Sequence, residues 1–116
     1  MTISRTGSTA APTEAFATSV ARNTGTWATG DLVNITLAGW NDTVEPTITA
    51  GFLTKTAGTA TIGTVTLDLV ASGSDGSGSK EWNCQWSFVV TAGGTLTVTA
   101  AGFPSSGGGS SLAISH

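Results

Sequence analysis

The sequence predicts an all-β fold, an antiparallel β-sandwich of the immunoglobulin-like or jelly-roll kind with about 6–8 short strands and no significant helix. Residues 81–90 alternate between apolar and polar side chains. Successive side chains of a strand point to opposite faces, so this period of two predicts a half-buried strand. Shorter segments with the same alternation recur at regular intervals, separated by turns that contain Gly, Asn or Asp. The Cys-Trp-Cys spacing of antibody domains is absent from the sequence, which excludes that type of sandwich.

In chain order, the predicted strands are residues 14–20, 32–37, 44–52, 61–70, 81–90 and 96–100. Apolar residues fit no clear period in the first of them, and its Thr and Ser neighbours favour a strand followed by a turn at residues 23–25. Pro46 places the third at an edge or a strand beginning, because proline cannot donate to a ladder. Residues 72–79 predict a flexible connection. Two glycines within residues 91–95 predict a tight hairpin between the last two strands.

Composition divides the chain into three parts. Residues 1–12 are small and polar apart from Ile3 and predict an N-terminal arm, residues 13–104 form the β-sandwich domain, and residues 105–116 are a Gly/Ser-rich linker and C-terminal tail. Arms of this kind can become ordered on a partner surface, and the alternative is that both are frayed termini. The candidate partner contacts in the two arms are Ile3, Arg5, Leu112 and Ile114.

The balance of charge excludes several classes of partner. Only 9% of the 116 residues are charged, and the formal net charge is −3. The four cationic residues lie singly along the chain, so we expect no nucleic-acid binding, which needs clustered cations. No segment approaches the roughly 20 apolar residues of a membrane span, and the N-terminus lacks the apolar core of a secretory signal. We therefore expect no membrane partner and synthesis in the cytoplasm.

The residues that usually carry catalysis are few in this sequence. His116 is the only histidine and the last residue, a poor position for a general base. Asp42 and Glu45 are the closest pair of acids, in a segment where solvated loop carboxylates are the ordinary explanation. Cys84 is the only cysteine and lies on the apolar face of a predicted strand, as a small core residue does. The sequence thus predicts no enzymatic activity and no metal or other cofactor.

Two tryptophans near predicted turns, Trp27 and Trp40, are candidates for a ligand platform. Stacking of a sugar requires an exposed aromatic ring with amide or carboxylate groups beside it, and Asn41 and Asp42 directly follow Trp40. Large aromatic residues at strand ends more often cap the open end of a sandwich core. The sequence therefore favours core capping and keeps a sugar-binding platform as the alternative.

A family resemblance rests on several segments taken together. They are Ala-Thr-Gly-Asp-Leu-Val at residues 28–33 leading into an apolar strand, Gly39-Trp40, the Gly/Ser loop and the Trp-rich strand at residues 82–90. In composition and pattern, the chain from about residue 28 to 103 resembles the small β-sandwich structural proteins of tailed bacteriophages, such as capsid decoration proteins and tail-associated accessory domains.

The resemblance implies a non-enzymatic structural protein of the virion. Such a protein binds the major capsid protein on the outer surface of the head, often as a homotrimer, and stabilises the capsid. Synthesis would then take place in the host cytoplasm. The alternative function is a carbohydrate-binding or adhesin module of the tail-fibre type that uses an exposed tryptophan. Both functions stand here as expectations.

Overall fold

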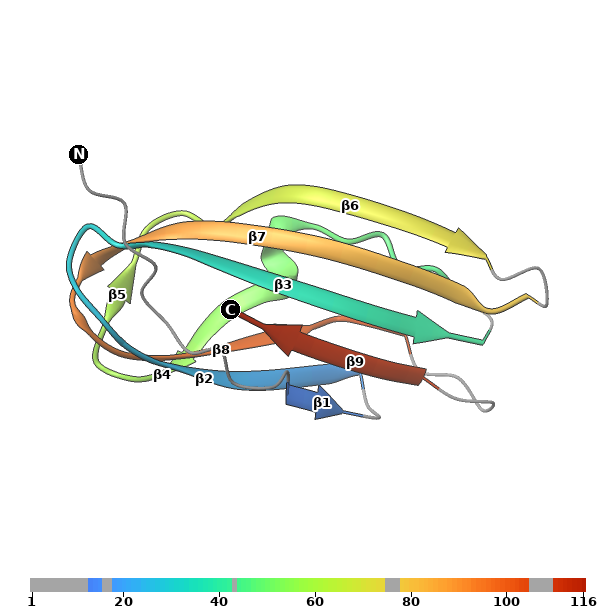
Figure 1. Ribbon diagram of the computed structural model, residues 1–116, viewed down its shortest axis with the longest axis horizontal. Helices are drawn as coiled ribbons and strands as arrows, with labels where there is room; N and C mark the ends of the chain where they lie inside the picture. The colour runs from blue at the N-terminus through green and yellow to red at the C-terminus, as the bar shows by residue number, and fades with distance from the viewer. Residues whose placement is uncertain (1–12, 16–17, 43, 75–77, 105–109) are drawn as a thin grey trace.

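The computed structural model describes residues 13–15, 18–42, 44–74, 78–104 and 110–116. These residues form an elongated all-β body, which confirms the predicted fold class (Figure 1). The strands are β1 Thr13–Ala15, β2 Ser19–Trp27, β3 Leu32–Asn41, β4 Leu53–Ala57, β5 Thr61–Ile62, β6 Thr66–Ser74, β7 Lys80–Ala92, β8 Gly94–Ala101 and β9 Ser110–Ser115, with a 3₁₀ turn η1 at Ala50–Phe52.

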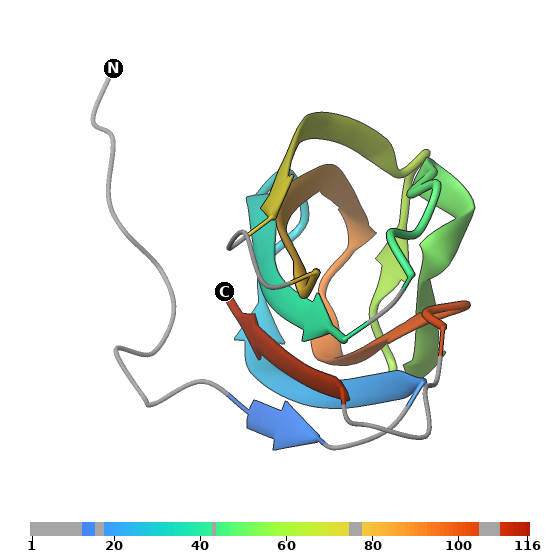
Figure 2. The same ribbon diagram turned by 90° about the vertical axis from the view of Figure 1, so that its right-hand side faces the viewer.

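Two antiparallel sheets of unequal width pack face to face. The larger sheet has the order β1-β9-β3-β7-β5, with β6 also paired to β7, and the smaller sheet has the order β2-β8-β4. Figure 2 looks along the molecule and shows the strands of both sheets curving around a common core. In the part of the chain that the structure describes, the larger sheet has six strands and the smaller sheet three.

The connectivity is that of a ribbon folded across both sheets. Strands β2 and β3 follow each other in the chain and pair with β8 and β7 in reverse order, β2 with β8 and β3 with β7. At the fold of the ribbon, the amide of Gly30 donates to the carbonyl of Val90 at 2.8 Å and the amide of Gly93 donates to the Thr29 hydroxyl at 2.9 Å. A folded ribbon of this kind is typical of double-sheet jelly rolls, the second of the two predicted alternatives.

The predicted hairpin at residues 91–95 is wrong. Strands β7 and β8 lie in different sheets, so the glycines at this position carry the chain across the end of the sandwich. Gly93 is needed there for close approach, because a Cβ atom on it would lie 2.9 Å from the carbonyl oxygen of Trp27. A short Gly-containing loop fits a hairpin and a crossing equally well, which is why the sequence pattern misleads here.

The core follows from the alternation in β3 and β7. Ile35 lies opposite Trp86 and Leu37 lies opposite Cys84 in the antiparallel register, and all four side chains are buried. Trp82 lies two residues beyond Cys84 on the same face of the strand and stacks on the ring of Phe103, with ring centroids 6.1 Å apart. The Trp-rich strand is therefore the centre of the core, as its period of two predicts.

Two predicted strands have other boundaries in the structure. Residues 44–49 form no strand, because Pro46 cannot pair and the carbonyl of Thr49 instead accepts a hydrogen bond from Trp86 Nε1 at 3.1 Å. Residues 61–70 divide into β5 and β6, and β6 continues to Ser74, into the predicted flexible connection.

The ends of the sandwich also differ from the prediction. The predicted strand at residues 14–20 is replaced by β1 and the start of β2. Strand β2 passes through the predicted turn at residues 23–25 with a register shift between Asn23 and Gly25, where Gly25 has a positive φ of 92°. Residues 110–115, expected in a tail, form β9 between β1 and β3.

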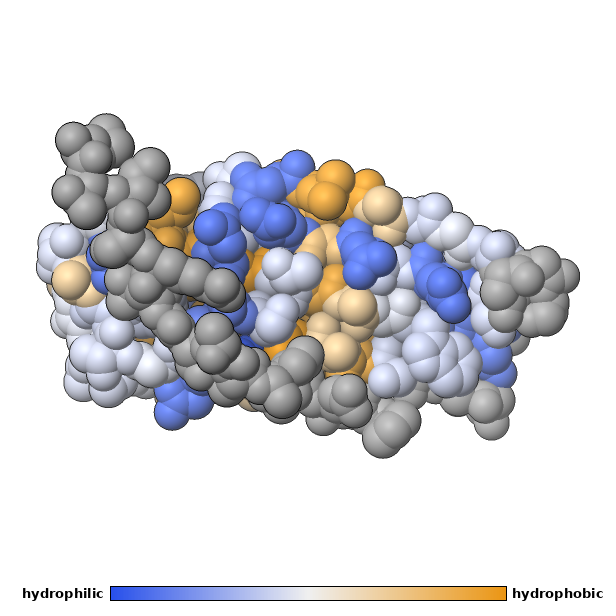
Figure 3. Space-filling model, viewed as in Figure 1, coloured by the Kyte–Doolittle hydropathy of each residue, from blue (hydrophilic) through white to orange (hydrophobic). Residues whose placement is uncertain are grey.

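Strand β6 is an exposed edge of the larger sheet. Its only pairing partner among the described strands is β7, and Leu69 and Val70 are 55% and 45% exposed. Figure 3 shows the resulting apolar surface along the upper edge of the molecule, over β6. Val70 lies opposite the buried Cys84, so it is on the core-facing side of the sheet but at a place that the narrower sheet leaves uncovered.

Candidate functional site

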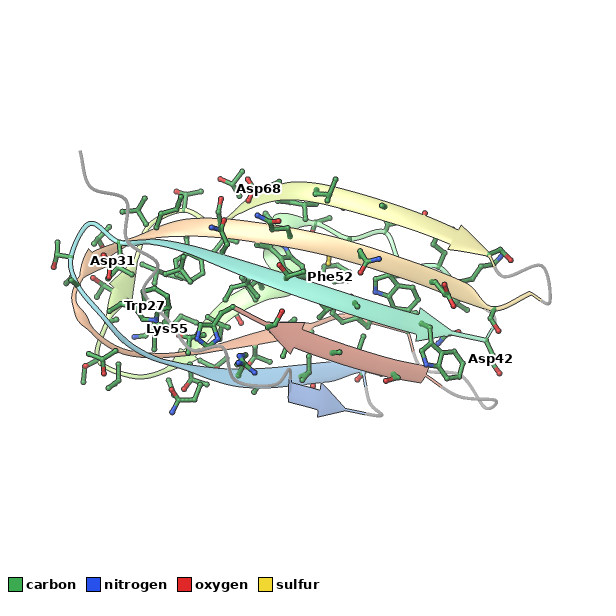
Figure 4. The ribbon with its side chains drawn as sticks, viewed as in Figure 1. Trp27, Asp31, Asp42, Phe52, Lys55 and Asp68 are labelled. Carbon is green, nitrogen blue, oxygen red and sulfur yellow. The ribbon has the colours of Figure 1, made fainter. Side chains whose placement is uncertain are left out.

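The residues predicted to form a ligand platform do not come together. Trp27 is at the end of β2 and Asp42 follows the end of β3, and Figure 4 shows them at opposite ends of the sandwich. Trp27 is only 6% exposed and Asn41 is buried, whereas Trp40 is 38% exposed. Of the predicted set, Trp40 alone offers a large aromatic surface to a ligand. The burial of Trp27 agrees with the favoured interpretation, core capping, and the alternative of a ligand platform does not hold for Trp27 or Asn41.

Trp27 caps one end of the core. Its indole Nε1 donates to the Thr24 hydroxyl at 2.8 Å, and that hydroxyl donates to the carbonyl of Leu96 at 3.0 Å. The ring of His116 meets the indole edge-on, with centroids 6.0 Å apart. This buried hydrogen-bonded arrangement holds β2 against the C-terminal end of β9 and leaves the indole no free face for a ligand.

Asn41 has a structural role at the other end. Its side-chain amide donates to the carbonyl of Pro104 at 3.2 Å, and its Oδ1 accepts from the amide of Val44 at 2.9 Å. These bonds fix the chain where it leaves β3. The neighbouring Asp42 is half-buried, and its Oδ1 has no hydrogen-bond partner within the described part of the chain.

Trp40 lies beside a hollow on the outer face of the larger sheet. The hollow has a volume of about 260 Å³ and spans β9, β3 and β7. In the register of the sheet, Trp40 lies between Glu81 on β7 and Ser111 on β9. Its lining residues are Ala38, Gly39, Trp40, Glu81, Trp82, Asn83, Ser111 and Ala113.

Small residues form the floor of this hollow and polar residues its rim. Ala38 lies between Asn83 and Ala113 in the next row of the sheet. Gly39 and Trp82 face the core, so by strand alternation they contribute main chain to the hollow. The Trp40 ring thus lies beside small side chains, which leave open space next to it.

The chemistry of the hollow suits binding better than catalysis. Among the described residues that line it, Glu81 is the only acid and none is a cation. Glycoside hydrolysis normally uses two carboxyl groups, and acyl transfer needs a nucleophile beside a base. Ser111 has no basic side chain next to it in the lining. An aromatic surface with a carboxylate, an amide and a hydroxyl can instead stack on a ligand and hydrogen-bond to its polar rim.

The predicted partner contacts in the two arms have different outcomes. Ile3 and Arg5 lie outside the described residues. Leu112 and Ile114 are buried in the core of the sandwich, because β9 is paired on both sides and turns these side chains inward. Leu112 and Ile114 are therefore unavailable to a partner in this structure, and the prediction for them is wrong.

The sequence pattern does not reveal the role of Arg22 and His116. Arg22 is 5% exposed, and its Nε donates to Nδ1 of His116 at 2.7 Å, within a wider set of interactions of both residues. The sequence feature that could have indicated the burial of Arg22 is its spacing, because Arg22 is two residues from Val20 and therefore shares the inward face of β2 with it. His116 is thereby held in place at the end of β9.

The remaining candidates for chemistry are separate from the hollow. Burial raises the pKa of the Cys84 thiol to about 12, so the reactive thiolate is scarce at neutral pH. Glu45 is exposed on the loop after β3. Within the described ranges, no group of three or more His, Cys, Asp or Glu side chains is arranged to hold a metal ion. The part of the chain that the structure describes contains no helix with the length and apolar character needed to cross a membrane.

Comparisons with protein-family models, with curated proteins and with solved structures found no match to this chain.

Proposed function

We propose that this protein is a non-enzymatic structural component of a bacteriophage particle that binds the outer surface of the assembled head and stabilises it. The observation that carries the proposal is the exposed edge strand β6. Its outer side has no pairing partner among the described strands, and its apolar side chains are uncovered. Such an edge can pair with a strand of another protein.

The side chains of β6 are suited to a protein partner. Leu69 lies opposite Gln85 and therefore on the outer face, whereas Val70 lies opposite Cys84 and on the core-facing side. Both faces of the edge thus present an apolar group beside the main-chain donors and acceptors. Asp68, at the register shift between Leu67 and Leu69, is the only charged residue of the strand. Charged side chains are a usual protection of free edges, and β6 has little of that protection.

The rest of the surface supports the same proposal. With 9% charged residues, the chain presents mostly Thr, Ser, Gly and Ala to its surroundings. These side chains lose little conformational entropy when a partner covers them, in contrast to Lys or Glu. A surface of this kind suits close packing against many identical subunits. We expect the protein to act on the major capsid protein and to assemble as a homotrimer.

The experiment is co-sedimentation with heads. Heads that lack this chain are prepared from the virus that encodes it and are mixed with rising amounts of purified protein. We expect uptake to saturate at a fixed number of copies per head and the unfolding temperature of the heads to rise. Heads that take up no protein at any concentration would remove the proposal.

Matched variants test the role of β6. Val70→Lys places a charge on the uncovered apolar side of the edge and should weaken binding to heads at least about tenfold, as for a desolvated charge at an interface. Thr54→Lys introduces the same charge on the exposed face of β4 in the other sheet and should bind as the wild type does. Equal binding of the two variants would show that β6 is not the contact.

A further inference from the structure

The hollow beside Trp40 has no lining residue from β6, although Glu81 and Asn83 on its rim pair with Gly73 and Ala71 of that strand. Its side chains come from the outer faces of β9, β3 and β7. The proposed contact of β6 with the head therefore does not explain the composition of the hollow, in particular the 38% exposure of Trp40 beside alanine and glycine residues.

We propose that this hollow binds a neutral pyranose sugar, with the Trp40 indole against the apolar face of the ring and with Glu81, Asn83 and Ser111 bonded to its hydroxyl groups. The proposal goes beyond the proposed function, because its ligand is a carbohydrate and its side chains come from β9, β3 and β7 and not from β6.

Size favours a single sugar ring. The hollow measures about 260 Å³. Pockets for drug-sized ligands measure roughly 300–1,000 Å³ and enclose most of the ligand, so this smaller and open site suits one ring of a longer glycan. Ala38 and Ala113 leave space beside Trp40 that larger side chains would fill.

The chemistry of the rim matches the two sides of a pyranose. One face of the ring presents C–H groups, which pack on an indole, and the edge presents hydroxyl groups that both donate and accept. The Glu81 carboxylate accepts two hydroxyl hydrogens, the Asn83 amide donates and accepts, and the Ser111 hydroxyl does both. All three lie within one residue pair of Trp40 or Ala38 in the sheet.

Charge selects a neutral sugar. Glu81 is the only charged residue among the described residues that line the hollow. A sialic or uronic acid would bring a second carboxylate close to Glu81 without a cation in the lining to offset the repulsion. We therefore expect neutral hexosides to bind and acidic sugars to bind much more weakly.

Two-dimensional ¹H–¹⁵N NMR tests the proposal. The four tryptophans give up to four indole N–H signals, and the Trp40 signal is the one missing from the spectrum of Trp40→Phe. The probes are methyl β-D-galactopyranoside and methyl β-D-glucopyranoside, with methyl β-D-glucuronide as the acidic counterpart. We expect at least one neutral probe to shift the Trp40 signal with a dissociation constant on the order of 1 mM, as for a ligand of about a dozen non-hydrogen atoms.

Two variants and a control separate the site from general effects. Trp40→Ala and Asn83→Ala should each weaken binding at least about tenfold, judged from main-chain signals of β3 and β7. Leu32→Ala removes an exposed apolar side chain at the opposite end of β3 and should bind as the wild type does. Stability is measured alongside, since a variant that fails to fold is replaced by Ser111→Ala.

Three results would overturn the proposal. They are an unchanged Trp40 signal at about 50 mM of both neutral probes, binding that survives Trp40→Ala, and tighter binding of the glucuronide. Purified protein is sufficient for the titration, so a negative result leaves the co-sedimentation with heads unaffected. Conversely, a protein that does not bind heads can still bind the sugar. Failure of the sugar-binding proposal is therefore distinguishable from failure of the proposed function.

Discussion

A single added methyl group at Gly39 should destabilise the fold. Gly39 lies opposite Trp82 in the β3–β7 ladder. A Cβ atom at this position would lie 2.6 to 2.8 Å from three atoms of the Trp82 indole. Trp82 is buried and stacked nearly parallel to the Phe103 ring, at an interplanar angle of 6°, so it cannot move without displacing a second aromatic ring. Overpacking of this kind costs about 1–3 kcal/mol.

The matched control is Gly73→Ala. Gly73 lies in β6, and an added Cβ atom would meet nothing within 4 Å. In an open strand position, alanine should stabilise by about 0.5–1 kcal/mol relative to glycine, because the unfolded chain loses freedom. The two variants make the same chemical change and should differ by about 1.5–4 kcal/mol in the free energy of unfolding.

The assay is urea unfolding followed by circular dichroism, with the m-value compared between variants. A third variant, Gly39→Ala combined with Trp82→Phe, should lose less stability than the sum of the single changes, because the smaller ring makes room for the methyl group. If Gly39→Ala is as stable as Gly73→Ala, the indole of Trp82 does not lie as close to β3 as described.

Two further predictions concern buried residues of β7. Trp86→Ala should destabilise by about 3–5 kcal/mol, because it empties a fully buried site and leaves the Thr49 carbonyl without its donor; an unchanged urea midpoint would contradict this. Burial raises the pKa of the Cys84 thiol from 9.0 to about 12, so the folded protein holds this proton more tightly than the unfolded chain does. This contribution to the stability of the fold is fully present below pH 9 and is lost as the pH rises toward 12. From pH 8 to 11, the free energy of unfolding measured in urea should therefore fall more steeply for the wild type than for Cys84→Ala. The two slopes should differ by at most about 1.4 kcal/mol per pH unit, and equal slopes would refute this prediction.

The sequence predicts best what depends on neighbours along one strand. The alternation at residues 81–90 correctly places Trp82, Cys84 and Trp86 inside, because the period of a strand is a local property. Pairing between strands is not local. The link between β7 and β8 fits a hairpin by its glycines, and only the folded ribbon decides that it crosses between sheets.

The candidate site is partly predictable for the same reason. Trp40 is identified from its position near a predicted turn, but the neighbours expected for it, Asn41 and Asp42, are the next residues in the chain. In a strand the next side chain points to the other face, so Asn41 is buried instead. The polar groups beside Trp40, Glu81 and Ser111, come from two other strands, and only the sheet register brings them together.

The most direct test of the proposed function is hydrogen exchange of the protein bound to heads, measured by mass spectrometry and compared with the free protein. The proposal is that β6 is the edge that meets the shell. It predicts that amides of residues 66–74 exchange more slowly in the bound protein, because their outward N–H groups acquire partners, while β4 at the opposite sheet is unchanged. Unchanged exchange in β6 on a head that carries the protein would contradict it.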